Sequence, residues 1–127
     1  MNKSILLVED NIDYQVMLKQ LLSNHGYQVA TANNGQDGLE FIKKNTPSID
    51  IIITDLHMPH LNGLEMAREV FLNKLSKAPI IILTTETSVR MRKEGIEAGV
   101  HHWIIKPVQE DKFLGTVDLL YSRYCKN

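Results

Sequence analysis

The sequence predicts an α/β fold built on a parallel β-sheet that helices cover on both faces. Short apolar runs alternate five times with longer segments whose apolar residues recur near helical spacing. The central run, Ile49–Ile53, contains four isoleucines, and a run that is apolar on both faces is typical of a strand in a parallel sheet. Repeated strand–helix units favour right-handed crossovers, so all the strands are expected to run in one direction.

The first strand and helix have clear boundaries. Ser4–Val8 is a short apolar run, and Glu9-Asp10-Asn11 ends it with two acids. A helix is expected to begin at Ile12 and to be stopped by His25-Gly26, where Gly26 suits the position after the C-cap. The apolar positions near helical spacing in this segment are Ile12, Val16, Leu18, Leu21 and Leu22.

The second unit is weaker in pattern. Tyr27–Thr31 predicts a modest strand near an edge of the sheet. The turn Asn33-Asn34-Gly35 precedes a short helix that contains Leu39 and ends before Pro47, because the residue before a proline disfavours helical geometry.

The third unit holds the central strand, Ile49–Thr54, which the carboxylate of Asp55 ends abruptly. Asn62 and Glu65 have the spacing of an N-cap pair. A helix is therefore expected from Gly63 to about Leu75.

The last two units follow the same pattern. Ile80–Leu83 is a third fully apolar strand, and a polar helix from about Thr87 to Ala98 follows it and is closed by Gly99. Trp103–Ile105 predicts a short final strand, and the last helix is expected from about Gln109 to Tyr124. The apolar residues expected on one side of this helix are Phe113, Val117, Leu120 and Tyr121.

Length and composition favour one compact domain over residues 1–127. The chain is 43% hydrophobic, which is enough for a core that needs no disulfide or metal cross-links. A net charge of −1 gives no basic footprint for direct nucleic-acid binding. The single Cys125 excludes an internal disulfide, and no stretch resembles a signal peptide or an apolar membrane span. A cytoplasmic location without membrane insertion is expected.

The residues that end the strands carry the chemistry. Glu9-Asp10 follows the first strand, Asp55 the third, Thr84 the fourth and Lys106 the fifth. Because the carboxyl ends of parallel strands lie at one edge, these side chains are expected to share a single cleft.

This set of side chains suits a phosphoryl group held beside a metal ion. Three acids against one lysine leave an excess of negative charge, and carboxylate oxygens suit Mg²⁺. A hydroxyl and an ammonium suit phosphoryl oxygens, and a carboxylate is a known acceptor of phosphoryl groups. The pattern therefore predicts metal-assisted phosphoryl transfer onto Asp55.

Nearly the whole chain, from Lys3 to about Tyr124, resembles a receiver domain of two-component response regulators, similar to the stand-alone chemotaxis regulators. The resemblance implies a flavodoxin-like (βα)5 three-layer sandwich with strand order 2-1-3-4-5. The motifs that carry it, in this order and spacing, are Val8-Glu9-Asp10, Asp55-Leu56-His57-Met58-Pro59-His60-Leu61-Asn62-Gly63, Leu83-Thr84 and Lys106-Pro107.

The resemblance also implies roles at the metal site. Asp55 is expected to be the phosphoacceptor, and Asp10 to bind Mg²⁺ directly together with Asp55. Glu9, which stands where aspartate is commoner, is expected to act through water. The backbone carbonyl of His57 is expected to complete the protein ligands.

On the phosphoryl side, the resemblance implies that Thr84 hydrogen-bonds the phosphoryl group and that Lys106 pairs with it. Lys106-Pro107 is expected to be a cis peptide. Trp103 occupies the position of the switch aromatic of the family, although its ring is bulkier than the usual tyrosine or phenylalanine. Thr84 and Trp103 are thus the expected switch residues.

The implied function is signalling, with no enzymatic activity beyond the chain's own phosphorylation and dephosphorylation. The expected phosphodonor is a histidine kinase or a phosphotransfer protein. An output protein is expected to dock on the face made by residues about 87–124. His57 and Glu86, each two residues beyond a reactive residue, are expected to set the lifetime of the phosphorylated state by admitting, holding or blocking the attacking water.

Two other classes of protein fit less well. Phosphohydrolases of the haloacid-dehalogenase type need a second acid two residues after the nucleophile, where this chain has His57. Flavin or dinucleotide binders would need a backbone cradle for phosphate, but the chain has no G-x-G-x-x-G motif. The histidine pairs His57-x-x-His60 and His101-His102 are interpreted as ordinary surface residues.

Overall fold

The computed structural model describes residues 3–45 and 48–125, which form the expected alternation of strands and helices. All four neighbouring strand pairs are parallel, and the five strands lie in the order β2-β1-β3-β4-β5. The predicted flavodoxin-like order 2-1-3-4-5 is confirmed, with β2 at an edge as expected. The strands are β1 (Lys3–Val8), β2 (Tyr27–Ala32), β3 (Ile51–Asp55), β4 (Ile80–Thr84) and β5 (His102–Ile105). The helices are α1 (Ile12–Asn24), α2 (Gly35–Asn45), α3 (Gly63–Leu72), α4 (Val89–Glu97) and α5 (Glu110–Tyr124).

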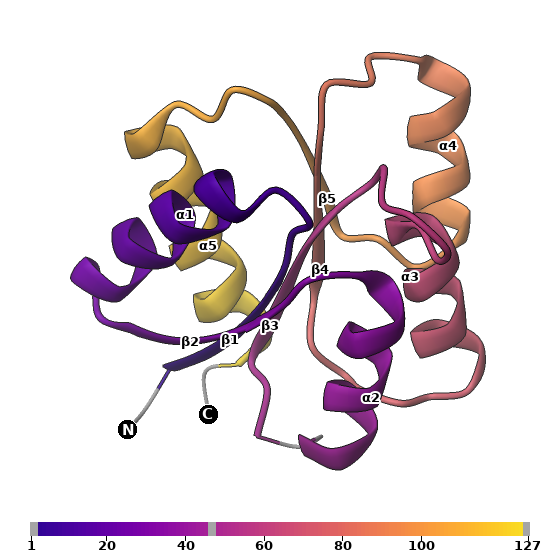
Figure 1. Cartoon of the computed structure of the whole chain (residues 1–127), viewed down its shortest axis with the longest axis horizontal. Helices are drawn as coiled ribbons and strands as arrows, with labels where there is room; N and C mark the ends of the chain where they lie inside the picture. Colours follow the sequence, from indigo (N-terminus) through magenta and orange to yellow (C-terminus); the bar gives the residue numbers. More distant parts are fainter. Residues whose placement is uncertain (1–2, 46–47, 126–127) are drawn as a thin grey trace.

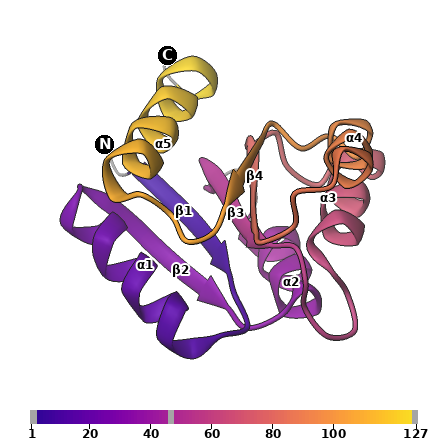
Figure 2. The ribbon, with the colours of Figure 1, turned by 90° about the horizontal axis from the view of Figure 1, so that it is seen from above.

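The molecule has three layers, with α1 and α5 on one face of the sheet and α2, α3 and α4 on the other (Figures 1 and 2). The strands send alternate side chains to two separate cores, because successive residues of a strand point to opposite faces. In β3, Ile51 and Ile53 pack with α1 and α5, whereas Ile52 packs with the opposite helices. This two-sided burial explains the isoleucine-rich run.

The central strand is two residues shorter at its start than expected. β3 begins at Ile51, whereas the sequence predicted a start at Ile49. Asp50 lies just before the strand, where a carboxylate oxygen accepts a hydrogen bond from the backbone N–H of Ser4 at 2.9 Å. All five residues of β3 are buried, and the strand includes Asp55 as its last residue.

The helix boundaries differ by a few residues from the predicted ones. The predicted capping box of Asn62 and Glu65 opens α3, but this helix ends at Leu72 instead of Leu75, because Lys74 has a positive φ of 51°. α4 begins at Val89 instead of Thr87, since Ser88 caps it by accepting a hydrogen bond from Met91. The predicted end of α2 before Pro47 lies outside the described residues.

One predicted core face is partly wrong. Ile12 and Val16 of α1 are 54% and 56% exposed, while Leu18 and Leu22 are fully buried. Gln15 takes an inward position instead of Val16. On α5, Phe113, Val117 and Leu120 are buried as predicted, and Tyr121 is half-buried. Among the described residues, no helix combines the length and apolar character needed to span a membrane.

Candidate functional site

The sheet brings the predicted acids to one edge. Val8 pairs with Thr54 across β1 and β3, so the next residues, Glu9 and Asp55, stand side by side at the carboxyl ends of these strands. Each of Glu9, Asp10 and Asp55 offers a carboxylate oxygen, and these atoms lie within 4.8 Å of one another. Glu9 is fully buried, Asp55 is 7% exposed and Asp10 faces solvent. The three acids therefore form one cluster with an open side.

Lys106 joins this cluster from the loop after β5. Its Nζ lies 3.0 Å from Oε1 of Glu9 and 3.2 Å from Oδ2 of Asp55. The side chain is only 16% exposed, and the backbone N–H of Lys106 donates to the carbonyl of Thr84 at 2.8 Å. One ammonium is thus shared by two buried carboxylates. The expected cis peptide at Lys106-Pro107 is present.

The ionisation of the pair reflects burial and charge. Burial raises the pKa of Glu9 above its usual value, against the lowering effect of hydrogen bonds from Lys106 and Asn11. Burial also acts to lower the pKa of Lys106, but the hydrogen bond to Glu9 and the charge of Asp55 outweigh it, so this pKa is raised. The raised pKa of Glu9 favours its neutral carboxyl form, whereas the raised pKa of Lys106 favours its charged ammonium form. Because one lysine faces two carboxylates, the ammonium is the form that this site holds most firmly.

Glu9 is fixed by a set of hydrogen bonds at the start of α1. The backbone N–H of Asn11 donates to the second carboxylate oxygen of Glu9 at 3.1 Å. The side-chain amide of Gln15 donates to the backbone carbonyl of Glu9 at 2.9 Å and to Oδ1 of Asn33 at 3.0 Å. Sequence analysis missed Gln15. The available signal was its position three residues before Leu18, a polar residue in line with the buried face of the helix.

The backbone of Asp55 is held from two sides. The buried hydroxyl of Thr54 donates to the carbonyl of Asp55 at 2.9 Å. Gly63 lies so close that a Cβ at this position would collide with the same carbonyl oxygen. The N–H of Gly63 also donates to the carbonyl of Leu56 at 2.9 Å. Glycine is therefore required where α3 begins, because only a residue without a Cβ lets the start of α3 pack against the Asp55 carbonyl.

Thr84 connects the acidic cluster to the loop between β4 and α4. It is 1% exposed, and its hydroxyl oxygen accepts the backbone N–H of Glu86 at 3.0 Å. The side chain of Glu86 extends towards His57, with 3.7 Å between Oε1 and Nε2. The structure thus brings together the two residues predicted to tune the lifetime, and the imidazole itself is 63% exposed.

Trp103 is attached to the same loop. Its indole Nε1 donates to the backbone carbonyl of Glu86 at 3.3 Å, and the side chain is 9% exposed. The ring faces Gly95 of α4, where an added Cβ would stand 3.0 Å from Cζ3 and 3.6 Å from a methyl group of Leu64. Thr84, Glu86 and Trp103 therefore form a connected path from the acidic cluster to the surface between α4 and β5.

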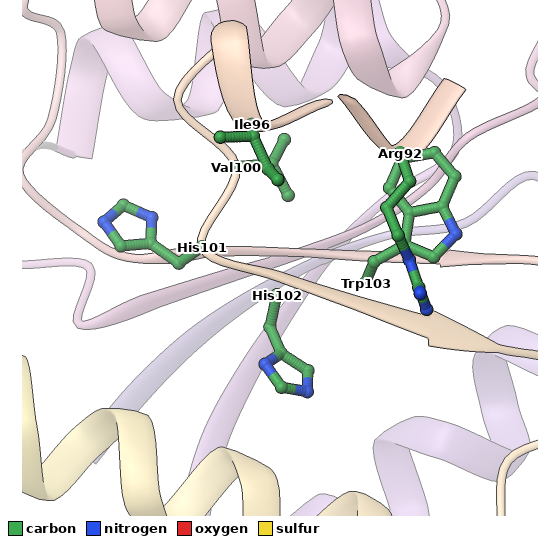
Figure 3. Close-up of a pocket in the computed structure, with 6 residues that line it drawn as sticks. All are labelled: Arg92, Ile96, Val100, His101, His102 and Trp103. Atoms are coloured by element: carbon green, nitrogen blue, oxygen red, sulfur yellow. The ribbon is translucent and has the colours of Figure 1, made fainter. Parts of the chain in front are cut away.

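A pocket of about 270 Å³ opens on this surface. Figure 3 shows Ile96 and Val100 together on one side of it, and Arg92 and Trp103 on the other side of the view. His101 and His102 point away from each other, so they do not form a metal-binding pair (Figure 3). The residues that line the pocket are Arg92, Ile96, Val100, His101, His102 and Trp103.

His101 and His102 are both exposed, so their interpretation as surface residues is confirmed, although each also has specific surroundings. Nδ1 of His101 accepts the backbone N–H of Ile80 at 3.1 Å, and burial lowers the pKa of this histidine. His102 is the first residue of β5, and burial together with Arg92 lowers its pKa. His57 and His60 are exposed, as expected.

Comparisons with known proteins agree with this geometry. Residues 5–118 match the model of the response regulator receiver domain. Protein PilH of Pseudomonas aeruginosa is 33% identical over 119 residues, which cover 93% of this chain and 97% of PilH. A segment of Histidine kinase P4 of Formosa agariphila is 35% identical over 111 residues, 87% of this chain and 8% of the kinase.

A solved structure shares the fold closely. The chemotaxis protein CheY4 of Vibrio cholerae superposes with a TM-score of 0.87 at 33% identity, covering 94% of this chain and 99% of that one. The chain spans about half or less of the length of several transcriptional regulatory proteins that it also matches. The family match over most of the chain, the sheet order and the acidic cluster beside a lysine lead to one conclusion: this chain belongs to the family of response regulator receiver domains.

Proposed function

We propose that the chain is a single receiver domain that accepts a phosphoryl group on Asp55 and, in response, changes a docking surface for an output protein. Receiver domains are in general signalling modules, and they pair with histidine kinases. The observation that carries the proposal is the position of Asp55, whose carboxylate lies within 4.8 Å of two other acids and 3.2 Å from the ammonium of Lys106. The donor is a histidine kinase or a phosphotransfer protein.

The reaction is a displacement at phosphorus. A carboxylate oxygen of Asp55 attacks the phosphorus atom, an O–P bond forms, and the P–N bond of a donor phosphohistidine breaks with its electron pair left on the imidazole nitrogen. Lys106, already beside Asp55, offers N–H donors to the phosphoryl oxygens. The hydroxyl of Thr84 supplies a further donor. The residues at this edge therefore hold the reacting oxygen and neutralise the incoming charge.

The acidic cluster fits a divalent ion. Its donors are hard carboxylate oxygens, and the exposed side at Asp10 leaves room for the waters that Mg²⁺ keeps. Asp10 and Asp55 would hold the ion directly, Glu9 through water, and the backbone carbonyl of His57 would complete the set. When bound, Mg²⁺ would neutralise charge on the phosphoryl oxygens. The ion pair with Lys106 keeps Glu9 turned inward, which agrees with an indirect role.

The output follows the path from Thr84 to Trp103. In the structure the hydroxyl oxygen of Thr84 accepts the backbone N–H of Glu86. A phosphoryl group on Asp55 recruits this hydroxyl as a donor. The loop that Glu86 occupies also holds the indole of Trp103, so both switch residues respond to one loop. The docking face, residues about 87–124, contains the pocket between α4 and β5. Amide exchange should change along residues 85–110 on phosphorylation, and a response limited to the Asp55 loop would contradict this switch.

The lifetime of the phosphorylated state is set by His57 and Glu86. Their side chains lie 3.7 Å apart, so they act as a pair where the loops after β3 and β4 meet. Hydrolysis needs a water in line with the phosphorus, opposite the oxygen of Asp55. Replacing both residues with alanine should change the rate of dephosphorylation by up to ~10²-fold and leave Mg²⁺ affinity nearly unchanged. An unchanged decay rate would place lifetime control elsewhere.

The central test is Asp55→Asn, which keeps the shape of the side chain and removes the nucleophilic charge. Protein is treated with acetyl phosphate and Mg²⁺, and intact mass is measured. The parent should gain one phosphate that resists acid and is released by alkali, and the variant should gain none. Labelling of the variant to the level of the parent would refute the assignment.

A further inference from the structure

Tyr14 makes two contacts with the segment that carries Lys106. Its ring faces the ammonium of Lys106, with Nζ 4.6 Å from the ring centroid. Its hydroxyl oxygen accepts the backbone N–H of Val108 at 3.2 Å. One side chain of α1 thus holds both ends of the tripeptide Lys106-Pro107-Val108, from a position 94 residues away in sequence from Val108.

The ring suits the position because it attracts the ammonium without taking a hydrogen bond. Lysine has three N–H donors, and two of them are directed at Glu9 and Asp55. The π face attracts a cation within about 6 Å through its quadrupole, and this attraction does not depend on the direction of an N–H bond. An acid in place of Tyr14 would compete for the donor that the phosphoryl group requires. The aromatic ring leaves that donor available.

The same property matters when Asp55 changes its charge. Before phosphorylation the ammonium bonds to two carboxylates, and afterwards it must turn its donors towards phosphoryl oxygens. A flexible lysine that is held only by those carboxylates would lose a fixed position at this moment. The ring of Tyr14 and the bond to Val108 involve neither carboxylate, so they are unaffected by the change.

We propose that Tyr14 is a positioning residue for phosphoryl transfer: its ring face keeps the ammonium of Lys106 beside Asp55, and its hydroxyl fixes the backbone at Val108. This inference rests on the proposed function of Asp55. The two contacts belong to different parts of the side chain and can be removed separately. Tyr14→Phe keeps the ring and removes the hydroxyl, whereas Tyr14→Leu removes both.

The chain supplies a matched control in Tyr121. The ammonium of Lys3 lies 5.1 Å from the centroid of the Tyr121 ring, a similar contact that involves none of the acids or Lys106. Tyr121→Leu therefore removes a cation–π contact of the same kind without touching the site. Tyr14 and Tyr121 are both partly buried, so the two leucine variants carry similar packing costs.

The experiment measures the rate of phosphorylation by acetyl phosphate with saturating Mg²⁺, using intact-mass time courses at a temperature where every variant is folded. Tyr14→Leu should react about fivefold more slowly than the parent. Tyr14→Phe and Tyr121→Leu should stay within about twofold of the parent. Exchange of the Val108 amide should become about fivefold faster in both Tyr14 variants. Mg²⁺ affinity should not change, because the two contacts of Tyr14 are with Lys106 and Val108 and not with the carboxylates.

Three outcomes would overturn the inference while the proposed function stands. Tyr14→Leu could react as fast as the parent, Tyr14→Phe could be as slow as Tyr14→Leu, or Tyr121→Leu could be equally slow. The first would remove any role for Tyr14, the second would remove the role of the ring, and the third would reduce the effect to general stability. A parent protein that gains no phosphate would instead refute the function itself, and the inference with it.

Discussion

Gly95 offers a sharp test of how Trp103 is held. This glycine lies inside α4, where alanine is normally the better helix former. Its missing side chain leaves room for the Trp103 ring, since an added Cβ would stand 3.0 Å from Cζ3 and 3.2 Å from Cε3. Gly95→Ala therefore sets the helix preference against the packing of the ring.

The magnitudes favour the packing. Replacing glycine with alanine in a helix interior gains up to about 1 kcal/mol. An added methyl group in a filled space costs about 1–3 kcal/mol. The ring has little freedom to yield, because moving it would stretch the hydrogen bond from Nε1 to the Glu86 carbonyl, worth about 1 kcal/mol. We expect Gly95→Ala to lower the free energy of unfolding by about 1 kcal/mol overall.

Gly115 is the matched control on α5. It is exposed, and an added Cβ there meets nothing within 4 Å. Gly115→Ala should therefore show the helix preference alone and raise the free energy of unfolding by about 0.5–1 kcal/mol. The assay is urea unfolding at 25 °C, followed by the fluorescence of the chain's single tryptophan and by circular dichroism.

The emission of folded Gly95→Ala adds a second readout. If the methyl group pushes the ring outwards, the emission maximum of Trp103 should shift to longer wavelength, whereas Gly115→Ala should leave it unchanged. Equal stabilisation in both variants, with unchanged emission, would refute the reasoning. That result would mean that the α4–β5 contact yields easily and does not hold the ring in one place.

Gly63→Ala should lower the free energy of unfolding by more than about 1 kcal/mol and slow phosphorylation, because the new Cβ would collide with the backbone oxygen of Asp55. Urea titration and mass labelling test this, and an unaffected variant would show that the loop adapts. The pKa of Lys106 is raised above 10.5, so its contribution to stability is complete below that pH and is lost as the pH rises through the folded pKa. The parent should thus lose stability more steeply above pH 10.5 than Lys106→Met does, and parallel curves would argue against this. Asp10→Ala should weaken Mg²⁺ binding at least about tenfold in a titration followed by Trp103 fluorescence, and parent-like affinity would exclude Asp10 as a ligand.

The order of strands and helices along the chain and the chemistry at the strand ends follow from the residue pattern. The isoleucine run of β3 is apolar at every position because both faces of the strand are covered, and this pattern is local. The acids at the carboxyl ends of β1 and β3 and the lysine after β5 could be placed together from the parallel topology alone. Their contacts in the structure, including the 3.2 Å between Lys106 and Asp55, agree with that expectation.

The side chains that support these residues, in contrast, depend on how distant elements pack together. The rotation of α1 about its axis leaves Val16 exposed, buries Gln15 and places Tyr14 against Lys106. The bond from Trp103 to the carbonyl of Glu86 likewise depends on where a loop and a strand meet. Such contacts join elements that are distant in sequence, and helical spacing alone fixes neither the rotation of a helix nor the course of a loop. They are set by packing of the whole sandwich, because each interior side chain must fill the space that the others leave.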